Sequence, residues 1–165
     1  MCGDRYPSLV RTLLLVLHVL GAVVALGFSL SYGFWVRRGE ADGVQGRAFA
    51  LRTISWIDQR ITTPAFIAQL ITGLLLVATL DWALLRQAWL EVSLGIYVLL
   101  TALAIGVYAP AFRRQREIAE RIAAGDGDEG EYSAAAAKGT AWGAVVTALT
   151  HVIVVLMVWK PALWN

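Results

Sequence analysis

The chain has 165 residues, of which 58% are hydrophobic and only 16% are charged. This composition is too apolar for an ordinary soluble domain, so it excludes the soluble classes and predicts an all-α integral membrane protein with one domain, residues 1–165. The single cysteine, Cys2, excludes intramolecular disulfides and sites built from several thiolates.

Four apolar stretches reach roughly the 20 residues that a helix needs to cross a bilayer. A helix can span lipid because it satisfies its own backbone hydrogen bonds. The predicted fold is therefore a four-helix membrane bundle. Its expected spans are approximately residues 12–36, 61–80, 88–112 and 139–159. The first stretch is longer than the roughly 7 to 15 apolar residues of a cleaved signal peptide, so we expect it to remain.

The connection after the first span begins with the glycine-rich turn RRGEADGVQG. In the following RAFALRTISWIDQR and the isoleucine after it, the residues Leu51, Ile54, Ile57 and Ile61 recur at helical spacing, which predicts a short amphipathic helix at the interface before span two. Asp58 and Arg60 form a further possible site near the inner end of span two, and we favour their interpretation as an interfacial ion pair that anchors the helix. Pro64 either starts a new helix or kinks a continuous one, and we favour the kink because a start there leaves a short span.

The second connection, DWALLRQAW, is short, so spans two and three should be antiparallel neighbours. Span three should continue as a helix through RRQREIAERIAA, with Glu117 and Arg121 paired at i, i+4, and should stop at Gly125. Ser133 is a suitable N-cap for the last helix.

The distribution of positive charge predicts the orientation. Ten of the 14 basic residues lie in the two long connections, and under the positive-inside rule this places both connections in the cytoplasm and both termini on the outer, periplasmic side. Tryptophans favour membrane interfaces. The set expected at the outer boundary is Trp82, Trp89, Trp159 and Trp164, and the set at the inner boundary is Trp35, Trp56 and Trp142.

Each span carries one stripe of polar and small residues at steps of three or four. Such stripes should face the bundle interior, where small residues permit close packing and hydroxyl groups bond across helices. The stripes are His18, Gly21, Ala25, Ser29 and Tyr32; Thr62, Phe66, Gln69, Thr72 and Gly73; Ser93, Tyr97, Thr101, Ala104 and Tyr108; and Thr140, Ala144, Thr147 and His151.

The two histidines, His18 and His151, are the candidate site residues, because ionisable groups inside a membrane usually mark function. They lie roughly 9 and 12 Å below the same outer boundary at about 1.5 Å per residue. At that level they could ligate both faces of a haem iron, and Arg11, on the face of His18, could meet a propionate. Two alternatives stay open: a structural pair that bonds across helices, or a metal-ion or proton-relay role. A zinc site is disfavoured because two nitrogen ligands fall short of the usual number.

Four segments resemble those of known membrane protein families: LHVLGAVVALG, ITTPAFIAQLITGLLL, AWLEVSLGIY and VWKP. Nearly the whole chain resembles a bacterial family of predicted integral membrane proteins of unknown function. More distantly it is similar to the four-helix membrane protoporphyrinogen oxidases, which hold haem b. That likeness rests on His18, the I-x-T-P-A segment at residues 61–65, Gly73 and the terminal Lys160 and Pro161.

The chain departs from the oxidase pattern at the third span, where the family's W-L-H-A-K is replaced by Trp89, Leu90, Glu91, Val92 and Ser93. The Asn-Glu pair before the last span is also absent. The resemblance thus implies a fold and a haem more than it implies a reaction, because fold analogy alone does not give a mechanism.

The leading hypothesis is a multi-pass protein of the bacterial inner membrane that holds one b-type haem between His18 and His151. It would serve electron transfer or the oxidation of a hydrophobic substrate, and whether it is an enzyme is left open. The main alternative is a non-enzymatic accessory or assembly subunit of a larger membrane complex. The expected partners are the lipid bilayer and other membrane subunits or further copies of the chain, not nucleic acid.

Overall fold

The computed structural model describes residues 8–80 and 82–162, and these form helices joined by short connections. The predicted all-helical class is confirmed, with four helices that are long and apolar enough to span a membrane. In chain order the elements are α1 (Ser8–Ala41), α2 (Gly43–Ile57), the π-helical turn η1 (Asp58–Thr62), α3 (Thr63–Leu80), the 3-10 helix η2 (Trp82–Arg86), α4 (Ala88–Leu103), the π-helical turn η3 (Ala104–Tyr108), α5 (Ala109–Ala123) and α6 (Glu129–Trp159). Cys2, Arg5 and Trp164 lie outside the described residues.

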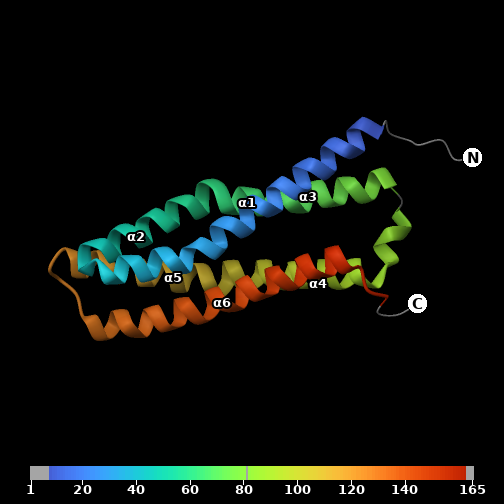
Figure 1. Ribbon diagram of the computed structural model, residues 1–165. Coiled ribbons are helices and arrows are strands. Elements are labelled where there is room, and N and C mark those ends of the chain that lie inside the picture. Colours follow the sequence, from blue (N-terminus) through green and yellow to red (C-terminus); the bar gives the residue numbers. More distant parts are fainter. Residues whose placement is uncertain (1–7, 81, 163–165) are drawn as a thin grey trace, which may run out of the picture.

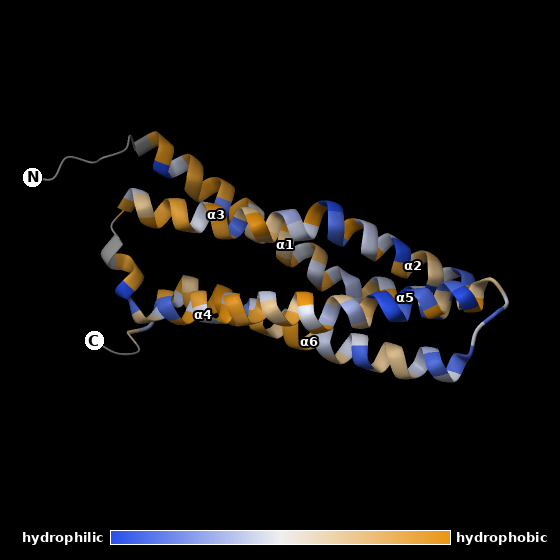
Figure 2. Cartoon of the chain, turned by 180° about the vertical axis from the view of Figure 1, so that it is seen from behind, coloured by the Kyte–Doolittle hydropathy of each residue, from blue (hydrophilic) through white to orange (hydrophobic). Residues whose placement is uncertain are grey.

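The four long helices are longer than a bilayer requires. They comprise 31 to 38 residues and so extend to about 47 to 57 Å at about 1.5 Å per residue, whereas a hydrocarbon core is about 30 Å thick. Each contains one predicted apolar stretch and continues past it at the same end of the bundle (Figures 1 and 2). We call this extension, residues 37–57 and 113–138, the polar end.

Two prolines explain the π-helical turns. A proline inside a helix lacks the N–H donor and its ring crowds the preceding turn, and a π-helical turn adds one residue and widens the helix there. Residues 58–62 end just before Pro64, and residues 104–108 end just before Pro110. The chain therefore runs through both prolines as continuous helices, Gly43–Leu80 and Ala88–Ala123, as expected at Pro64.

The helices form two layers (Figure 1). In one layer α1 packs against α2 and α3, and in the other α6 packs against α4 and α5. The layers meet mainly through α2 and α5 at the polar end. Spans two and three run antiparallel, as predicted (Figure 1), but they are not packed neighbours, because η2 contacts both α3 and α4 while the described residues of α3 and α4 make no backbone contact with each other. One long side chain crosses the gap: Tyr97 OH donates to the carbonyl oxygen of Phe66 at 2.8 Å.

The dense hydrophobic core lies at the polar end. Leu51, Ile118, Ala119, Tyr132 and Ala135 form a buried cluster there. Water drives apolar side chains together at this end, whereas lipid gives no such drive between membrane helices. The two layers are therefore joined outside the apolar stretches and separate within them.

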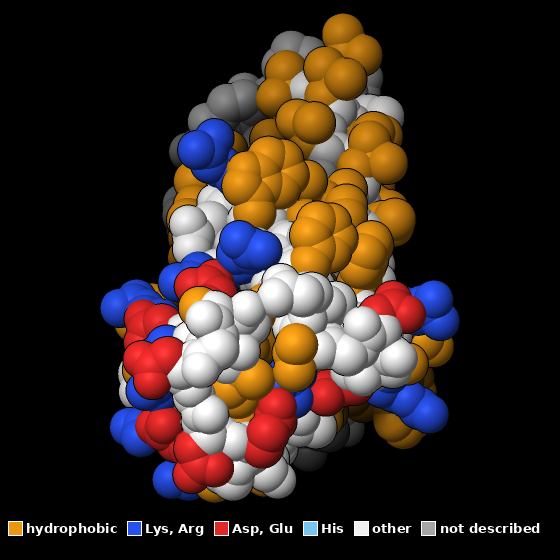
Figure 3. Space-filling view, turned by 90° about the vertical axis from the view of Figure 1, so that its left-hand side faces the viewer, with side chains coloured by type: hydrophobic (Ala, Val, Ile, Leu, Met, Phe, Trp, Pro, Cys, Tyr) orange, Lys and Arg blue, Asp and Glu red, His pale blue; other side chains and the backbone are white. Residues whose placement is uncertain are grey.

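A buried arginine also fixes the polar end. Arg47 donates two hydrogen bonds to Glu129, at 2.9 and 2.7 Å, and its guanidinium lies 3.9 Å from the centre of the Tyr132 ring. Burial, helped by the hydrogen bond to Glu40, raises the pKa of Tyr132 to about 12, so its phenol stays protonated and donates to Glu40. Acidic and basic side chains crowd around this end in Figure 3.

Two local predictions for this end are corrected, and a third is confirmed. Arg121 pairs with Glu131 on α6 at 2.8 Å instead of with Glu117. The last helix begins at Glu129 instead of near Ser133, because the Asp128 side chain caps it by accepting from the Gly130 N–H at 2.8 Å. Gly125 ends α5 with a φ of +88°, as expected.

The short helix predicted before span two is present as α2. Its residues Leu51 and Ile54 are fully buried, and the helix packs against α1 and α5. Its depth relative to a membrane surface stays a prediction, as does the orientation of the chain.

A candidate ligand cleft between the helix layers

A cleft of about 1000 Å³ lies between the two layers within the apolar half of the bundle. Its walls are mainly apolar, with a few hydroxyl groups and charged groups from both layers. Ligand sites in proteins have this size and character. The cleft is therefore the candidate site.

His151 on α6 lines the cleft. Its Nδ1 lies 2.7 Å from the carbonyl oxygen of Thr147. A carbonyl oxygen can only accept, so Nδ1 carries a hydrogen, and Nε2 is the ring nitrogen that this bond leaves for another partner. A backbone partner of this kind fixes the tautomer and orientation of metal-binding histidines.

His18 on α1 does not line the cleft. Its Nδ1 lies 2.9 Å from the hydroxyl oxygen of Thr72 on α3. That hydroxyl already donates to the carbonyl of Ala68 at 2.7 Å, so the imidazole N–H is the donor. The ring also covers Gly73, since a Cβ at that position would lie 3.2 Å from the ring atom Cε1. His18 thus belongs to the contact between α1 and α3, and the structure does not bring it to His151.

Arg11 donates from Nη2 to the carbonyl oxygen of Thr79 at 3.0 Å. Carbonyl groups in the last turn of a helix lack helical partners and attract cations. Arg11 therefore lies on the end of α3, away from the residues that line the cleft. Its role toward a propionate stays a prediction.

The polar stripe of span one faces that of span two. Besides the His18 contact, a Cβ at Gly21 would lie 3.4 Å from Gln69 Oε1, and the hydroxyl groups of Tyr32 and Thr62 lie 2.6 Å apart. In the other layer, a Cβ at Gly143 would lie 3.3 Å from the ring of Tyr108. Small residues therefore permit close packing, as predicted.

The predicted hydrogen bonds across helices are only partly present. Several stripe hydroxyls donate instead to the carbonyl four residues earlier in their own helix, because that acceptor is always within reach in an apolar surrounding. These hydroxyls belong to Ser29, Ser93 and Thr101.

Asp58 lies at the end of the cleft next to the polar end, where the sequence alone did not predict a cleft. Asp58 was expected to pair with Arg60, but among the described contacts its carboxylate accepts from Tyr32 OH, at 3.4 Å, and it lines the cleft. Pro64, about two turns further along the chain, was the sequence signal for this change of partner, because it induces the π-helical turn that begins at Asp58.

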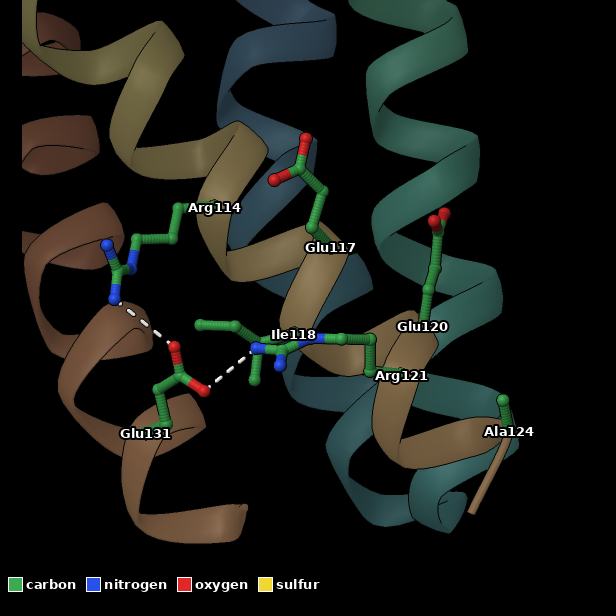
Figure 4. Close-up of a pocket in the computed structure, with 7 residues that line it drawn as sticks. All are labelled: Arg114, Glu117, Ile118, Glu120, Arg121, Ala124 and Glu131. Atoms are coloured by element: carbon green, nitrogen blue, oxygen red, sulfur yellow. Dashed lines mark hydrogen bonds and ion pairs between the residues drawn. The ribbon is translucent and has the colours of Figure 1, made fainter. Parts of the chain in front are cut away.

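A second hollow, of about 640 Å³, lies on α5 and the start of α6 (Figure 4). Its two arginines, Arg114 and Arg121, both point at Glu131 and pair with it. Because their charges are already neutralised within the chain, this hollow is a weaker site than the cleft.

These features define a class: a polytopic α-helical membrane protein with a cleft between two layers of spanning helices. Within that class, the chain belongs to the family described as predicted integral membrane protein (DUF2269), whose family model matches residues 12–161. No curated protein matches the chain, and no solved structure does. The predicted resemblance to an uncharacterised membrane family is confirmed, whereas the likeness to protoporphyrinogen oxidases stays a prediction.

Proposed function

We propose that the protein binds b-type haem in the cleft with His151 as the axial ligand, for electron transfer or for oxidation of a hydrophobic substrate. One observation carries this proposal. His151 stands on the wall of a large apolar cleft with its Nδ1 held by a backbone carbonyl, which leaves Nε2 as a free donor atom. Histidine in this state is a standard axial ligand.

The residues around His151 fit such a cofactor. Thr147 on α6 holds the imidazole, and apolar side chains of both layers, among them Ile67, Leu100 and Val146, line the cleft. When bound, haem would supply one-electron redox chemistry. The contribution of the chain is ligation, a low-dielectric surrounding and orientation.

Ligation by His18 as a second ligand, and a role for Arg11 at a propionate, are the further parts of the haem hypothesis that the sequence suggests. To ligate in the cleft, His18 would have to give up its hydrogen bond to Thr72 and turn away from α3. The structure therefore favours His151 as the first ligand. Ligation by His151 alone predicts that only a His151 variant loses the cofactor, whereas ligation by both histidines predicts that a variant of either one loses it.

The test is the absorption spectrum of detergent-purified protein after expression with ample haem. We expect a Soret band that is lost in His151→Ala and retained in His18→Ala. Loss in both variants, with folding intact by circular dichroism, would show bis-histidine ligation. Absence of the band in the wild-type protein, or a band unchanged in His151→Ala, would reject the proposal.

The alternative, an accessory or assembly subunit, has its own observation. Phe49 and Trp56 lie seven residues apart on one face of α2 and are 60% and 58% exposed. Phe49 lies beyond the apolar stretches, where exposed aromatic side chains mark contacts with other proteins. If this alternative holds, stoichiometric partners co-purify in mild detergent and are lost in Phe49→Ser. Purification as an isolated small oligomer would exclude it.

We also propose that the polar end faces the cytoplasm of a bacterial inner membrane. The ten basic residues of the long connections lie at or next to this end, and the positive-inside rule supports the assignment. Lys160 lies over the ring of Trp89 at 5.6 Å, so these residues share the opposite end. Alkaline phosphatase fused after residue 165 should be active, whereas the same fusion in the 124–128 connection should be inactive, and the reverse result would invert the orientation.

A further inference from the structure

Two arginines from different layers line the mouth of the cleft next to the polar end. They are Arg37 on α1 and Arg113 on α5. Each directly follows a predicted apolar stretch, residues 12–36 and 88–112. Both guanidinium groups therefore lie where the hydrocarbon ends and lipid phosphate groups begin.

Each of these arginines is adjacent to another arginine that has an acidic partner. Arg38 pairs with Asp42 at 3.0 Å, and Arg114 pairs with Glu131 at 3.2 Å. Within residues 8–80 and 82–162, neither Arg37 nor Arg113 has an acidic group within ion-pair distance. The cleft-facing member of each pair is thus the one whose charge the described residues leave without an acidic partner.

The wall beyond the arginines is long and apolar. Gly139 and His151 both line the cleft and are separated by 12 residues of α6, which is about 18 Å at about 1.5 Å per residue. Asp58 is the acidic residue among the described lining residues. Its carboxylate already accepts a hydrogen bond from Tyr32. The two arginines therefore outnumber the one aspartate, and the mouth is positively charged next to an elongated apolar part of the cleft.

We propose that this mouth binds the headgroup of an anionic phospholipid from the surrounding bilayer, with an acyl chain in the cleft. Arginine forms strong, often bidentate hydrogen bonds with phosphate. The apolar walls suit a chain that leaves the bilayer sideways between the layers, because the backbones of α3 and α4 do not meet. The headgroup site does not rest on the proposed haem, since the two arginines and His151 line opposite ends of the cleft.

The test is titration of delipidated, detergent-purified protein with phosphatidylglycerol or phosphatidylcholine, followed by native mass spectrometry. We expect tighter binding of phosphatidylglycerol, weakened about tenfold in Arg37→Gln/Arg113→Gln, as expected for the loss of charge-assisted hydrogen bonds. The matched control is Arg38→Gln/Arg114→Gln, which removes the same charge from adjacent positions and should bind as the wild type does. Equal losses in both double variants, or equal binding of the two lipids, would overturn the proposal.

A second pair of variants tests the acyl chain. Ala144 lines the cleft, whereas Ala141 is exposed on the same helix and does not. Ala144→Trp should reduce binding of phosphatidylglycerol, and Ala141→Trp should not. Glycerol phosphate, which has the headgroup but no chain, should fail to compete at equal concentration. Competition by glycerol phosphate, or unchanged lipid binding in Ala144→Trp, would overturn the placement of the chain in the cleft.

Discussion

The Nδ1 of His18 lies 2.9 Å from the hydroxyl oxygen of Thr72, so the histidine of the first span holds α1 against α3. The ring also sits over Gly73, which leaves room for it. This relationship accounts for an imidazole inside an apolar span without a cofactor. It separates the roles of the two histidines, since only His151 faces the cleft.

The first prediction concerns this hydrogen bond. His18→Phe and Thr72→Val should each destabilise the fold, and their double-mutant cycle should give a coupling of about 0.6 kcal/mol, the average for hydrogen bonds between membrane helices, and at most about 1.7 kcal/mol. The measurement is reversible unfolding in mixed micelles. Additive effects of the two substitutions would show that the contact contributes nothing.

The second prediction concerns the space at Gly73. A Cβ there would lie 3.2 Å from the imidazole Cε1, whereas a Cβ at Gly95 would meet nothing within 4 Å. Gly73→Val should therefore cost about 1 to 3 kcal/mol by overpacking, relative to Gly95→Val in the other layer. Equal unfolding free energies for the two variants would contradict the packing of His18 on Gly73.

The third prediction concerns the buried arginine and pH. The two hydrogen bonds from Arg47 lower the pKa of Glu129 from its ordinary value of 4.5. A lowered folded-state pKa gives stability that is present above pH 4.5 and is lost as the pH falls through the folded-state value. Glu129→Gln should therefore lower the melting temperature at pH 7, and the difference from the wild type should shrink in acid.

Glu117 provides the control for this pH dependence. It is exposed on α5 and belongs to the same charged end. Glu117→Gln should leave the melting temperature nearly unchanged at both pH values. A wild-type advantage over Glu129→Gln that persists undiminished at acidic pH would show that the Arg47 contact is not its source.

The fourth prediction concerns where stability resides. Leu51 is fully buried in the cluster at the polar end, whereas Leu75 is 46% exposed on α3. Leu51→Ala should cost about 2 to 5 kcal/mol, the usual range for a buried leucine, and Leu75→Ala much less. If the two substitutions cost the same in unfolding experiments, the polar end is not the element that joins the layers.

Some features could be predicted from the sequence because they follow from local chemistry. The apolar stretches gave the four helices, and the continuous helix through Pro64 followed from the length that a span requires. The facing stripes of spans one and two followed from helical spacing, as the contacts of His18 and Gly21 show.

Other features depend on contacts between distant segments. The separation of α3 and α4 depends on η2, whose short sequence suggests only a tight turn. Arg121 pairs with Glu131 on another helix. Spacing along the sequence suggests Glu117 as its partner and cannot show that Glu131 lies closer in the fold. Likewise, the sequence predicts similar depths for His18 and His151, but not which helix face each ring occupies.

The most direct test of the account is the low-temperature electron paramagnetic resonance spectrum of the ferric protein, purified after expression with ample haem. The account predicts the high-spin signal of an iron with one histidine ligand, which is absent from His151→Ala and unchanged in His18→Phe. A low-spin bis-histidine signal, or no haem iron signal in the wild-type protein, would contradict it.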